Sequence, residues 1–274
     1  MPPWEPELVK AAARLLAIAL VTAALGVAAL YTWGVRMSDL AHFGEVRNAL
    51  YVNGETVKIP LPEGNPRRLA PIVVAGETGE FGFTLVGIDG PVLHDPCVAI
   101  GWQISTPSMP PGADDVVREA VAEIAARTGL VWEDKGYTGQ PATFDRPSLV
   151  FTAEWEWAPV VIGWGTEGDN LDLEGATAGV GGPMETPGAY GETHYLRSGT
   201  VVLDVDAFPT NLDDEGQRAQ ARAVIMHELG HVVGLDHVTD ANELMYPAST
   251  AVTTWGPGDL RGLAAAGAGA CEVA

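Results

Sequence analysis

The sequence is poor in positive charge, in histidine and in cysteine. Lysine and arginine number 15 among 274 residues, against 36 aspartates and glutamates, and the formal net charge is −21 at pH 7. Nucleic acids and anionic membrane surfaces attract basic proteins, so this balance argues against both as partners and favours solubility. An apolar content of 47% is ample for a core, and the length fits one large domain or two small ones.

Charged residues are also absent from a long run near the N-terminus. Residues 15–33 (LLAIALVTAALGVAALYTW) are uncharged and follow Lys10 and Arg14. A run of this length can span a bilayer, and the preceding cations orient the N-terminus toward the cytoplasm. We therefore predict a signal anchor, a transmembrane helix, within residues 1–34, with the rest of the chain outside the cell. Cleavage at the small residues 24–29 is the alternative, and it would give a secreted protein.

Three of the six histidines lie within eleven positions. The segment 213–233 (DDEGQRAQARAVIMHELGHVV) has apolar and small residues at helical spacing after an acidic start, which predicts a helix. His227 and His231 are four residues apart and therefore lie on one face of this helix, where two imidazoles can share an ion. Gly234 lets the chain leave the helix through a positive-φ turn, so that His237 can fold back as a third ligand.

These residues predict one zinc ion held by His227, His231 and His237. Zinc accepts three protein ligands plus a water molecule in a tetrahedral site, and it lowers the pKa of that water to about 7. Glu228 follows the first ligand but is turned about 100° around the helix. This position suits a general base that reaches the water without binding the metal. A short HExxH string also arises by chance on solvated helix faces, but the pattern here is longer.

The longer pattern is HELGHVVGLDH at 227–237, followed by Met245. It resembles the signature of the metzincin zinc metallopeptidases, including the methionine of their Met-turn. Within the metzincins the chain is most similar to the matrixin-like group (peptidase family M10). There, ELMYP at 243–247 resembles the Met-turn and GPGDLRGL at 256–263 resembles the short C-terminal helix. Weaker similarity to the first strand, the first long helix with the second strand, and the third strand extends through residues 95–104, 113–133 and 158–165.

The resemblance implies an α+β zincin catalytic domain over residues 95–274. Its parts are a twisted mixed sheet, a long first helix, an active-site helix, the Met-turn and a C-terminal helix. Met245 would form an apolar base beneath the histidines, and an extended substrate would pair with the edge strand at 176–182. Residues 248–255 would line the specificity pocket. Because position 247 is proline, no tyrosine ligand is expected there.

Other matrixin features are missing from the sequence. No cysteine-switch string of the PRCGxPD type occurs, and the structural zinc and calcium loops are not recognisable between residues 171 and 206. His194 falls in this stretch and is expected to be a surface histidine, so no second metal is predicted. Residues 35–94 are predicted to be a stalk and a small β-rich linker. This region either packs on the catalytic domain or serves as a latency segment.

The two cysteines flank the predicted catalytic domain. Cys97 begins its first strand and Cys271 follows its last helix, and an exported chain favours a disulfide bond between them. Closing so long a loop is worth roughly 4–5 kcal/mol in chain-entropy models. Free thiols are one alternative, and a Cys97 thiolate that blocks the zinc is another.

The resemblance implies a zinc endopeptidase that acts on peptide or protein substrates, and we expect the protein to be a monomer. Water activated by the metal would attack the peptide bond, with Glu228 as the general base. Two alternatives use the same residues differently. A membrane-tethered, non-catalytic zinc scaffold needs the histidines but not Glu228. Hydrolysis of a non-protein amide needs the same residues in a pocket of another shape. The presence of Glu228 favours an enzyme.

Overall fold

The computed structural model describes residues 44–62, 66–248 and 250–273, together with residues 16, 19–22 and 25–26. The chain divides into two compact units, Met1–Glu45 with Ala274, and Val46–Val273. The described residues between 16 and 26 are helical. Among the residues that the structure describes, no helix combines the length and the apolar character needed to cross a membrane. Most of the predicted anchor, 1–34, lies outside the described residues, so the anchor and its cleavage remain predictions.

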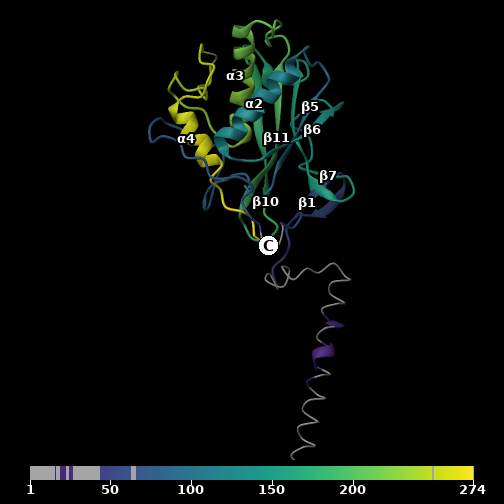
Figure 1. The fold of residues 1–274 in the computed structure, drawn as a ribbon. Helices are drawn as coiled ribbons and strands as arrows, with labels where there is room; N and C mark the ends of the chain where they lie inside the picture. The colour runs from purple at the N-terminus through teal and green to yellow at the C-terminus, as the bar shows by residue number, and fades with distance from the viewer. Residues whose placement is uncertain are drawn as a thin grey trace, which may run out of the picture. The chain divides into compact units, whose positions relative to one another are not determined.

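The unit Val46–Val273 is built on a five-stranded mixed sheet (Figure 1). The spatial order of its strands is β10-β11-β9-β5-β6, in which β10 pairs antiparallel and the other pairs are parallel. The central strand β9 is buried along its whole length, as is typical of parallel strands covered on both faces. The strand bounds are β5 Ile100–Ser105, β6 Trp132–Thr138, β9 Val160–Gly165, β10 Gly179–Pro187 and β11 His194–Asp204.

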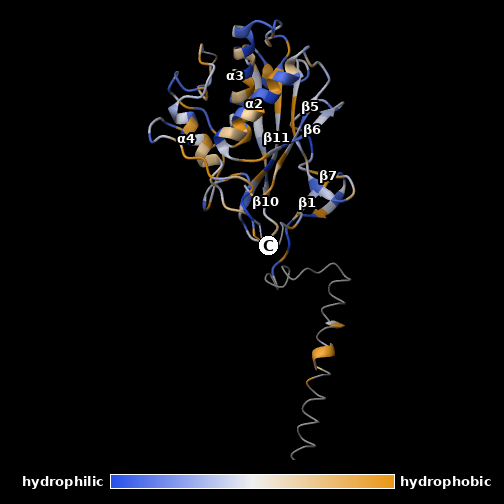
Figure 2. Cartoon of the chain, in the orientation of Figure 1, coloured by the Kyte–Doolittle hydropathy of each residue, from blue (hydrophilic) through white to orange (hydrophobic). Residues whose placement is uncertain are grey.

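Three helices complete the scaffold: α2 Ala113–Thr128, α3 Glu215–Val232 and α4 Pro257–Ala266. Helix α2 packs against α3 and α4, and α3 packs against β10 and β11 (Figure 1). Figure 2 shows hydrophobic and hydrophilic residues on the same helices, as expected when one face is buried. Asp214 caps α3 by accepting the backbone N–H of Gln217 at 2.9 Å. These elements agree with the α+β fold expected of a zincin catalytic domain.

The core lies between the sheet and the helices. Alternate residues of β9, Val160 and Ile162, face this main core, whereas Val161 joins a smaller cluster on the other side of the sheet. That smaller cluster includes Leu173, from the short 3-10 helix η2 (Leu171–Leu173). Helix α2 contributes a buried face of Val116, Val117, Ala120, Val121 and Ile124 to the main core.

Three small hairpins lie outside the five-stranded sheet. They are β1 (Ala49–Val52) with β2 (Glu55–Lys58), β3 (Val86–Gly87) with β4 (Gly90–Pro91), and β7 (Leu149–Phe151) with β8 (Trp155–Trp157). Val52 and Val57 of the first hairpin share a hydrophobic cluster with Leu149 of the third. The first hairpin thereby packs on the predicted catalytic region.

The described part of the predicted 35–94 region belongs to the same compact unit as the residues after it, since that unit begins at Val46. The boundary predicted at residue 95 does not separate two compact units. Beyond the hairpin contacts, Phe83 forms a β-bridge with Leu235, in the turn that follows α3. Of the two arrangements left open by the sequence, these contacts favour packing on the catalytic region.

The two ends of the predicted catalytic domain meet at a disulfide bond and a buried ion cluster. Cys97 and Cys271 are bonded across 174 residues of chain, as the sequence predicts. Beside them, the buried guanidinium of Arg197 pairs with Glu272 and lies 3.6 Å from Asp95. A buried cation of this kind is tolerated only when it is paired and hydrogen-bonded. The bonded Cys97 is not a free thiolate that could block a metal.

His94 should make the stability of the fold depend on pH. Burial, and secondarily the charge of Arg197, lower its pKa from 6.5 to about 4. The unfolded chain therefore binds more protons than the folded chain between these values. The stability that His94 contributes is fully present above pH 6.5 and is lost as the pH falls toward 4. By pH 5 the loss should be roughly 2 kcal/mol.

This loss can be measured by urea unfolding of the wild type and of His94→Gln at pH 7 and pH 5. The side-chain amide of the variant can still donate to the Val232 carbonyl, which lies 3.0 Å from His94 Nε2, but it does not titrate. We expect the wild type to lose more stability than the variant on acidification. Parallel losses in the two proteins would contradict the assignment, because all other titrating groups are common to both.

Candidate metal centre

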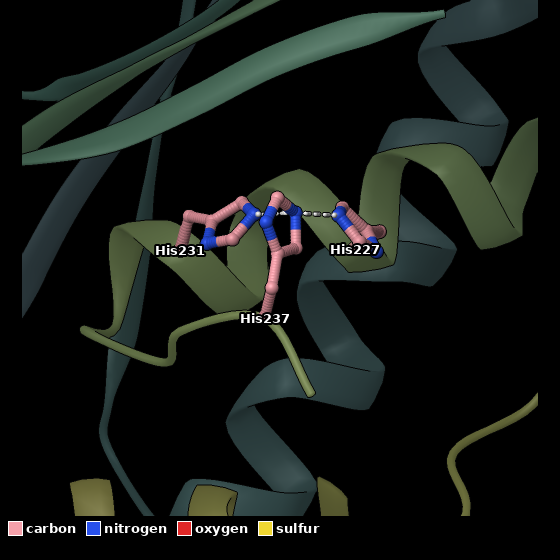
Figure 3. Close-up of side chains that lie close together, drawn as sticks. All are labelled: His227, His231 and His237. Atoms are coloured by element: carbon pink, nitrogen blue, oxygen red, sulfur yellow. Dashed lines mark hydrogen bonds between the residues drawn. The ribbon is translucent and has the colours of Figure 1, made fainter. Parts of the chain in front are cut away.

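Three imidazole rings face one another at the C-terminal end of α3 (Figure 3). His227 and His231 come from the helix, and His237 comes from the loop after it. The Nε2 atom of His237 lies 3.2 Å from the Nε2 atoms of both His227 and His231. Nitrogens placed tetrahedrally at 2.0–2.1 Å from one zinc ion would be roughly 3.3 Å apart, so the donor set fits that ion.

The other nitrogen of each helical histidine is held by a backbone carbonyl. His227 Nδ1 lies 2.6 Å from the Leu244 carbonyl oxygen, and His231 Nδ1 lies 2.8 Å from that of Leu235. A carbonyl can only accept, so Nδ1 carries the proton and Nε2 presents its lone pair. Burial lowers the pKa of His227, and it lowers that of His231 to about 4. Both rings are therefore kept in the neutral form that binds metal.

Gly234 makes the turn that returns His237 to the helix. Its φ of 98° lies in the left-handed region that favours glycine, as the sequence predicts. The turn is held by the N–H of Leu235, which donates to the Gly230 carbonyl at 2.9 Å. The following N–H, that of Asp236, donates to the Gly82 carbonyl at 3.0 Å. A segment more than 150 residues earlier in the chain thus fixes the loop that carries the third histidine.

Met245 lies in the core next to α3. It is 1% exposed, and a Cβ atom built on Gly230 would lie 2.5 Å from its sulfur, so the helix and the methionine pack without room for a side chain at 230. The Met245 carbonyl accepts the backbone N–H of Val238 at 3.1 Å. The residue therefore links the loop after His237 to the helix, as expected of a Met-turn.

Two buried carboxylates hold the backbone of this turn. Asp259 accepts the N–H groups of Leu244 at 2.5 Å, Met245 at 3.2 Å and Gly256 at 2.9 Å. Glu243 accepts those of Gly258 at 2.8 Å and Asp259 at 2.9 Å. Burial raises the pKa of Asp259 to about 6, against the effect of its hydrogen bonds. Together the two acids join the Met-turn to the first turn of α4.

Glu228 follows His227 on α3 and is 6% exposed. Burial raises its pKa to about 8, and the nearby backbone N–H of Gly181 in β10 partly opposes this shift. A cation bound at the histidines would act in the opposite direction, because a nearby positive charge favours the ionised form. A carboxyl group in such surroundings can take up and return protons near neutral pH.

The histidines and Glu228 line a cleft of about 880 Å³. Residues 176–181 of the predicted substrate strand form part of its wall. Ala248, Thr250 and Val252 line it as predicted for the specificity segment. Trp255, at the end of that segment, does not: it is 8% exposed and packs in the main core near Gly230. The wall on α3 is formed by Gln220, Ala223 and Val224.

His194 takes no part in the three-histidine group. It lies at the start of β11, is exposed, and its Nδ1 lies within hydrogen-bond distance, 2.8 Å, of Glu185 Oε1. Its surface position agrees with the expectation from the sequence.

Comparison with known proteins identifies the family. The matrixin family model matches residues 118–256, half of the chain. The chain belongs to the matrixin family. Matrixins are zinc-dependent metallopeptidases, which supports zinc as the ion of this centre. The match spans most of α2, the sheet except β5, the three histidines and the Met-turn. Strand β5, the segment around Gly82 and α4 lie outside it.

Individual relatives are distant from this matrixin. It is 30% identical to matrilysin of Rattus norvegicus over 136 residues, 48% of this chain and 43% of the relative. It is 32% identical to interstitial collagenase A of Mus musculus over 136 residues, 48% of this chain and 25% of the relative. The chain spans less than half the length of these curated relatives. An archaemetzincin structure from Methanopyrus kandleri covers 60% of this chain and 86% of its own, at 19% identity and a TM-score of 0.35, too low to support an argument.

Sequence reasoning missed Glu243, Asp259 and Gly181. Asp259 carries a signal in hindsight, because an acid three positions after Gly256, with proline between them, is typical of a capped helix start. Glu243 is an acid beside a recognised motif, and its burial depends on tertiary packing. Gly181 lies in a glycine-rich strand whose close approach to α3 is visible only in three dimensions.

Asp259→Asn should loosen the Met-turn of this matrixin. The amide has one acceptor oxygen, so at least one of the three N–H groups loses its partner, at a cost of about 1–3 kcal/mol. Since Leu244 holds His227, zinc affinity should fall by about tenfold as well. Urea unfolding and competition with a chelator measure the two effects. Asp89→Asn, an exposed change, is the control. Unchanged stability and zinc affinity in Asp259→Asn would show that the carboxylate does not fix the turn.

Proposed function

We propose that this chain is a zinc-dependent endopeptidase. The observation that carries the proposal is the convergence of three histidines in the same cleft as a buried carboxylate. The Nε2 atom of His237 lies 3.2 Å from that of His227 and 3.2 Å from that of His231. Three neutral nitrogen ligands leave one position of a tetrahedral zinc ion open, as catalytic sites require. Membership of the matrixin family supports the same activity.

Each residue then has a separate role. His227, His231 and His237 would hold the zinc ion, which would supply the Lewis acidity that polarises a peptide carbonyl. Glu228 takes the proton of the attacking water and returns it to the leaving amine. Met245 forms the apolar support beneath the histidines, and Gly234 allows the turn between the second and third of them.

The substrate is a peptide or protein segment in extended form. It pairs with the outer edge of the strand around residues 176–182, since β10 is an edge strand of the sheet. A side chain next to the scissile bond enters the space between α3 and the segment after the Met-turn. Ala223, Val224 and Val252 give this space apolar walls.

Glu228→Gln and His231→Ala should separate catalysis from metal binding. Removal of the general base should lower the rate of peptide cleavage by about 10²–10⁴-fold while leaving one zinc ion per chain. Loss of a ligand should remove zinc as well as activity. The assay is a peptide library incubated with the full chain, with and without chelator, and read by mass spectrometry together with elemental analysis.

Three outcomes would contradict the proposal. A wild type without stoichiometric zinc would exclude the metal centre. Cleavage by Glu228→Gln at the wild-type rate would exclude the mechanism. A wild type that holds zinc and cleaves no peptide would instead support a non-catalytic scaffold.

We also propose that residues 15–33 anchor the protein in the membrane, with the catalytic unit outside the cell. The uncharged run after Lys10 and Arg14 supports this topology. Peptide mapping of the protein purified from membranes should then recover residues N-terminal to Leu15. Recovery of mature chains that begin near Ala29 would instead indicate a cleaved signal and a secreted enzyme.

A further inference from the structure

Strand β10 lies against α3 at two glycines. Gly179 and Gly181 are two residues apart, so they share one face of the strand. A Cβ atom built on Gly181 would lie 2.3 Å from the backbone carbonyl oxygen of Glu228. One built on Gly179 would lie 3.1 Å from Glu228 Cγ and 3.3 Å from Oε1. Both glycines therefore lie against Glu228. Gly181 lies against its backbone, and Gly179 lies against its side chain.

The backbone of β10 is oriented so that Gly181 can serve this carboxylate. Asp204 of β11 donates its N–H to the Ala178 carbonyl at 3.0 Å, and the register runs on without a shift past Gly181. Inward and outward peptide groups alternate along an antiparallel strand. The backbone groups of residues 178, 180 and 182 thus form hydrogen bonds with β11. The N–H groups of Gly179 and Gly181 point away from β11, toward the free edge of the sheet. The N–H of Gly181 lies close enough to the Glu228 carboxylate to lower the pKa of that group.

We infer that Gly181 is a positioning residue for Glu228. The missing side chain lets β10 approach α3 closely enough for the Gly181 N–H to hold the carboxylate in one place. A Cβ at 2.3 Å from a main-chain oxygen cannot be relieved by a side-chain rotation, so the strand itself would have to move away. The hydrogen bond to Glu228 would then lengthen, and the carboxylate would lose its fixed position beside the histidines.

This role also limits what the edge strand offers to a peptide. The next outward position after Gly181 is Pro183, which has no N–H group. If the Gly181 N–H serves Glu228, the N–H of Gly179 is the one among residues 179, 181 and 183 that can still bind a substrate strand. A substrate strand therefore finds one donor there and several carbonyl acceptors.

The inference rests on the proposed peptidase function and is tested by a graded series of alanine variants. Gly181→Ala should lower kcat by about 10- to 100-fold, since a misplacement of about 1 Å at a catalytic group has effects of this size. Gly179→Ala requires the side chains of Glu228 and Leu203 to shift by only a few tenths of an ångström, so its loss should be smaller. Zinc content and zinc affinity should be unchanged in both variants, because the atoms nearest to either added Cβ belong to Glu228 and Leu203 and not to a histidine.

Gly163→Ala is the matched control. Its Cβ would lie 2.6 Å from Ser105 Cβ, a comparable clash within the same sheet that involves no residue of the site. This variant should lose stability without a loss of kcat in the folded fraction. If all sheet glycines act only through stability, Gly163→Ala and Gly181→Ala will behave alike, and the inference is wrong.

A double-mutant cycle decides whether the effect passes through Glu228. In single-turnover assays, Gly181→Ala should cost little further activity when Glu228 is already glutamine, whereas an effect through substrate binding alone would persist. If Gly181→Ala does not fold, the same cycle applies to Gly179→Ala. If the wild type cleaves peptides and both alanine variants keep its kcat, the positioning role is wrong but the proposed function stands. A wild type that cleaves nothing overturns the proposed function instead.

Discussion

Two hydrogen bonds from imidazole Nδ1 atoms to backbone carbonyls determine the geometry of the metal centre. The Leu244 carbonyl orients His227, and the Leu235 carbonyl orients His231. Helix α3 alone would leave both rings free to rotate, because spacing along a helix fixes the face but not the side-chain torsions. The site therefore depends on whatever holds these two carbonyls. Both lie outside the helix, in the turn that follows it and in the Met-turn.

Each carbonyl is held by a different physical device. Leu235 is held by backbone bonding, through its N–H to Gly230 and its bridge to Phe83. Leu244 is held by charge, through the buried carboxylate of Asp259. A buried carboxylate is costly unless several donors surround it, and Asp259 has three backbone N–H groups. The same bonds pair backbone amides of the Met-turn and of the start of α4 that would otherwise lack a partner. Hydrogen bonds to both elements therefore offset the cost of burying the Asp259 carboxylate.

The local parts of the site could be predicted from the sequence, and the contacts between distant parts could not. The spacing of His227 and His231, the positive φ of Gly234 and the link between Cys97 and Cys271 follow from helix period, glycine chemistry and cysteine number. The sequence predicts Trp255 in the pocket because it follows the Met-turn, but its large apolar surface is buried beside Gly230. The packing of residues 46–94 could not be read either, since short strands rich in glycine have no pattern that selects a partner.

The contacts of this early segment explain why the compact unit starts well before the first strand of the sheet. The carbonyl of Gly82 accepts the N–H of Asp236, and the carbonyl of Gly234 accepts the N–H of Thr84. The segment 82–84 therefore holds the irregular loop that carries His237 through two backbone hydrogen bonds. The segment in turn leads to Asp95 and Cys97, where the disulfide bond and the Arg197 cluster fasten the chain to its C-terminal end. The same segment therefore contacts the loop of the third ligand at one end and carries the disulfide bond at the other.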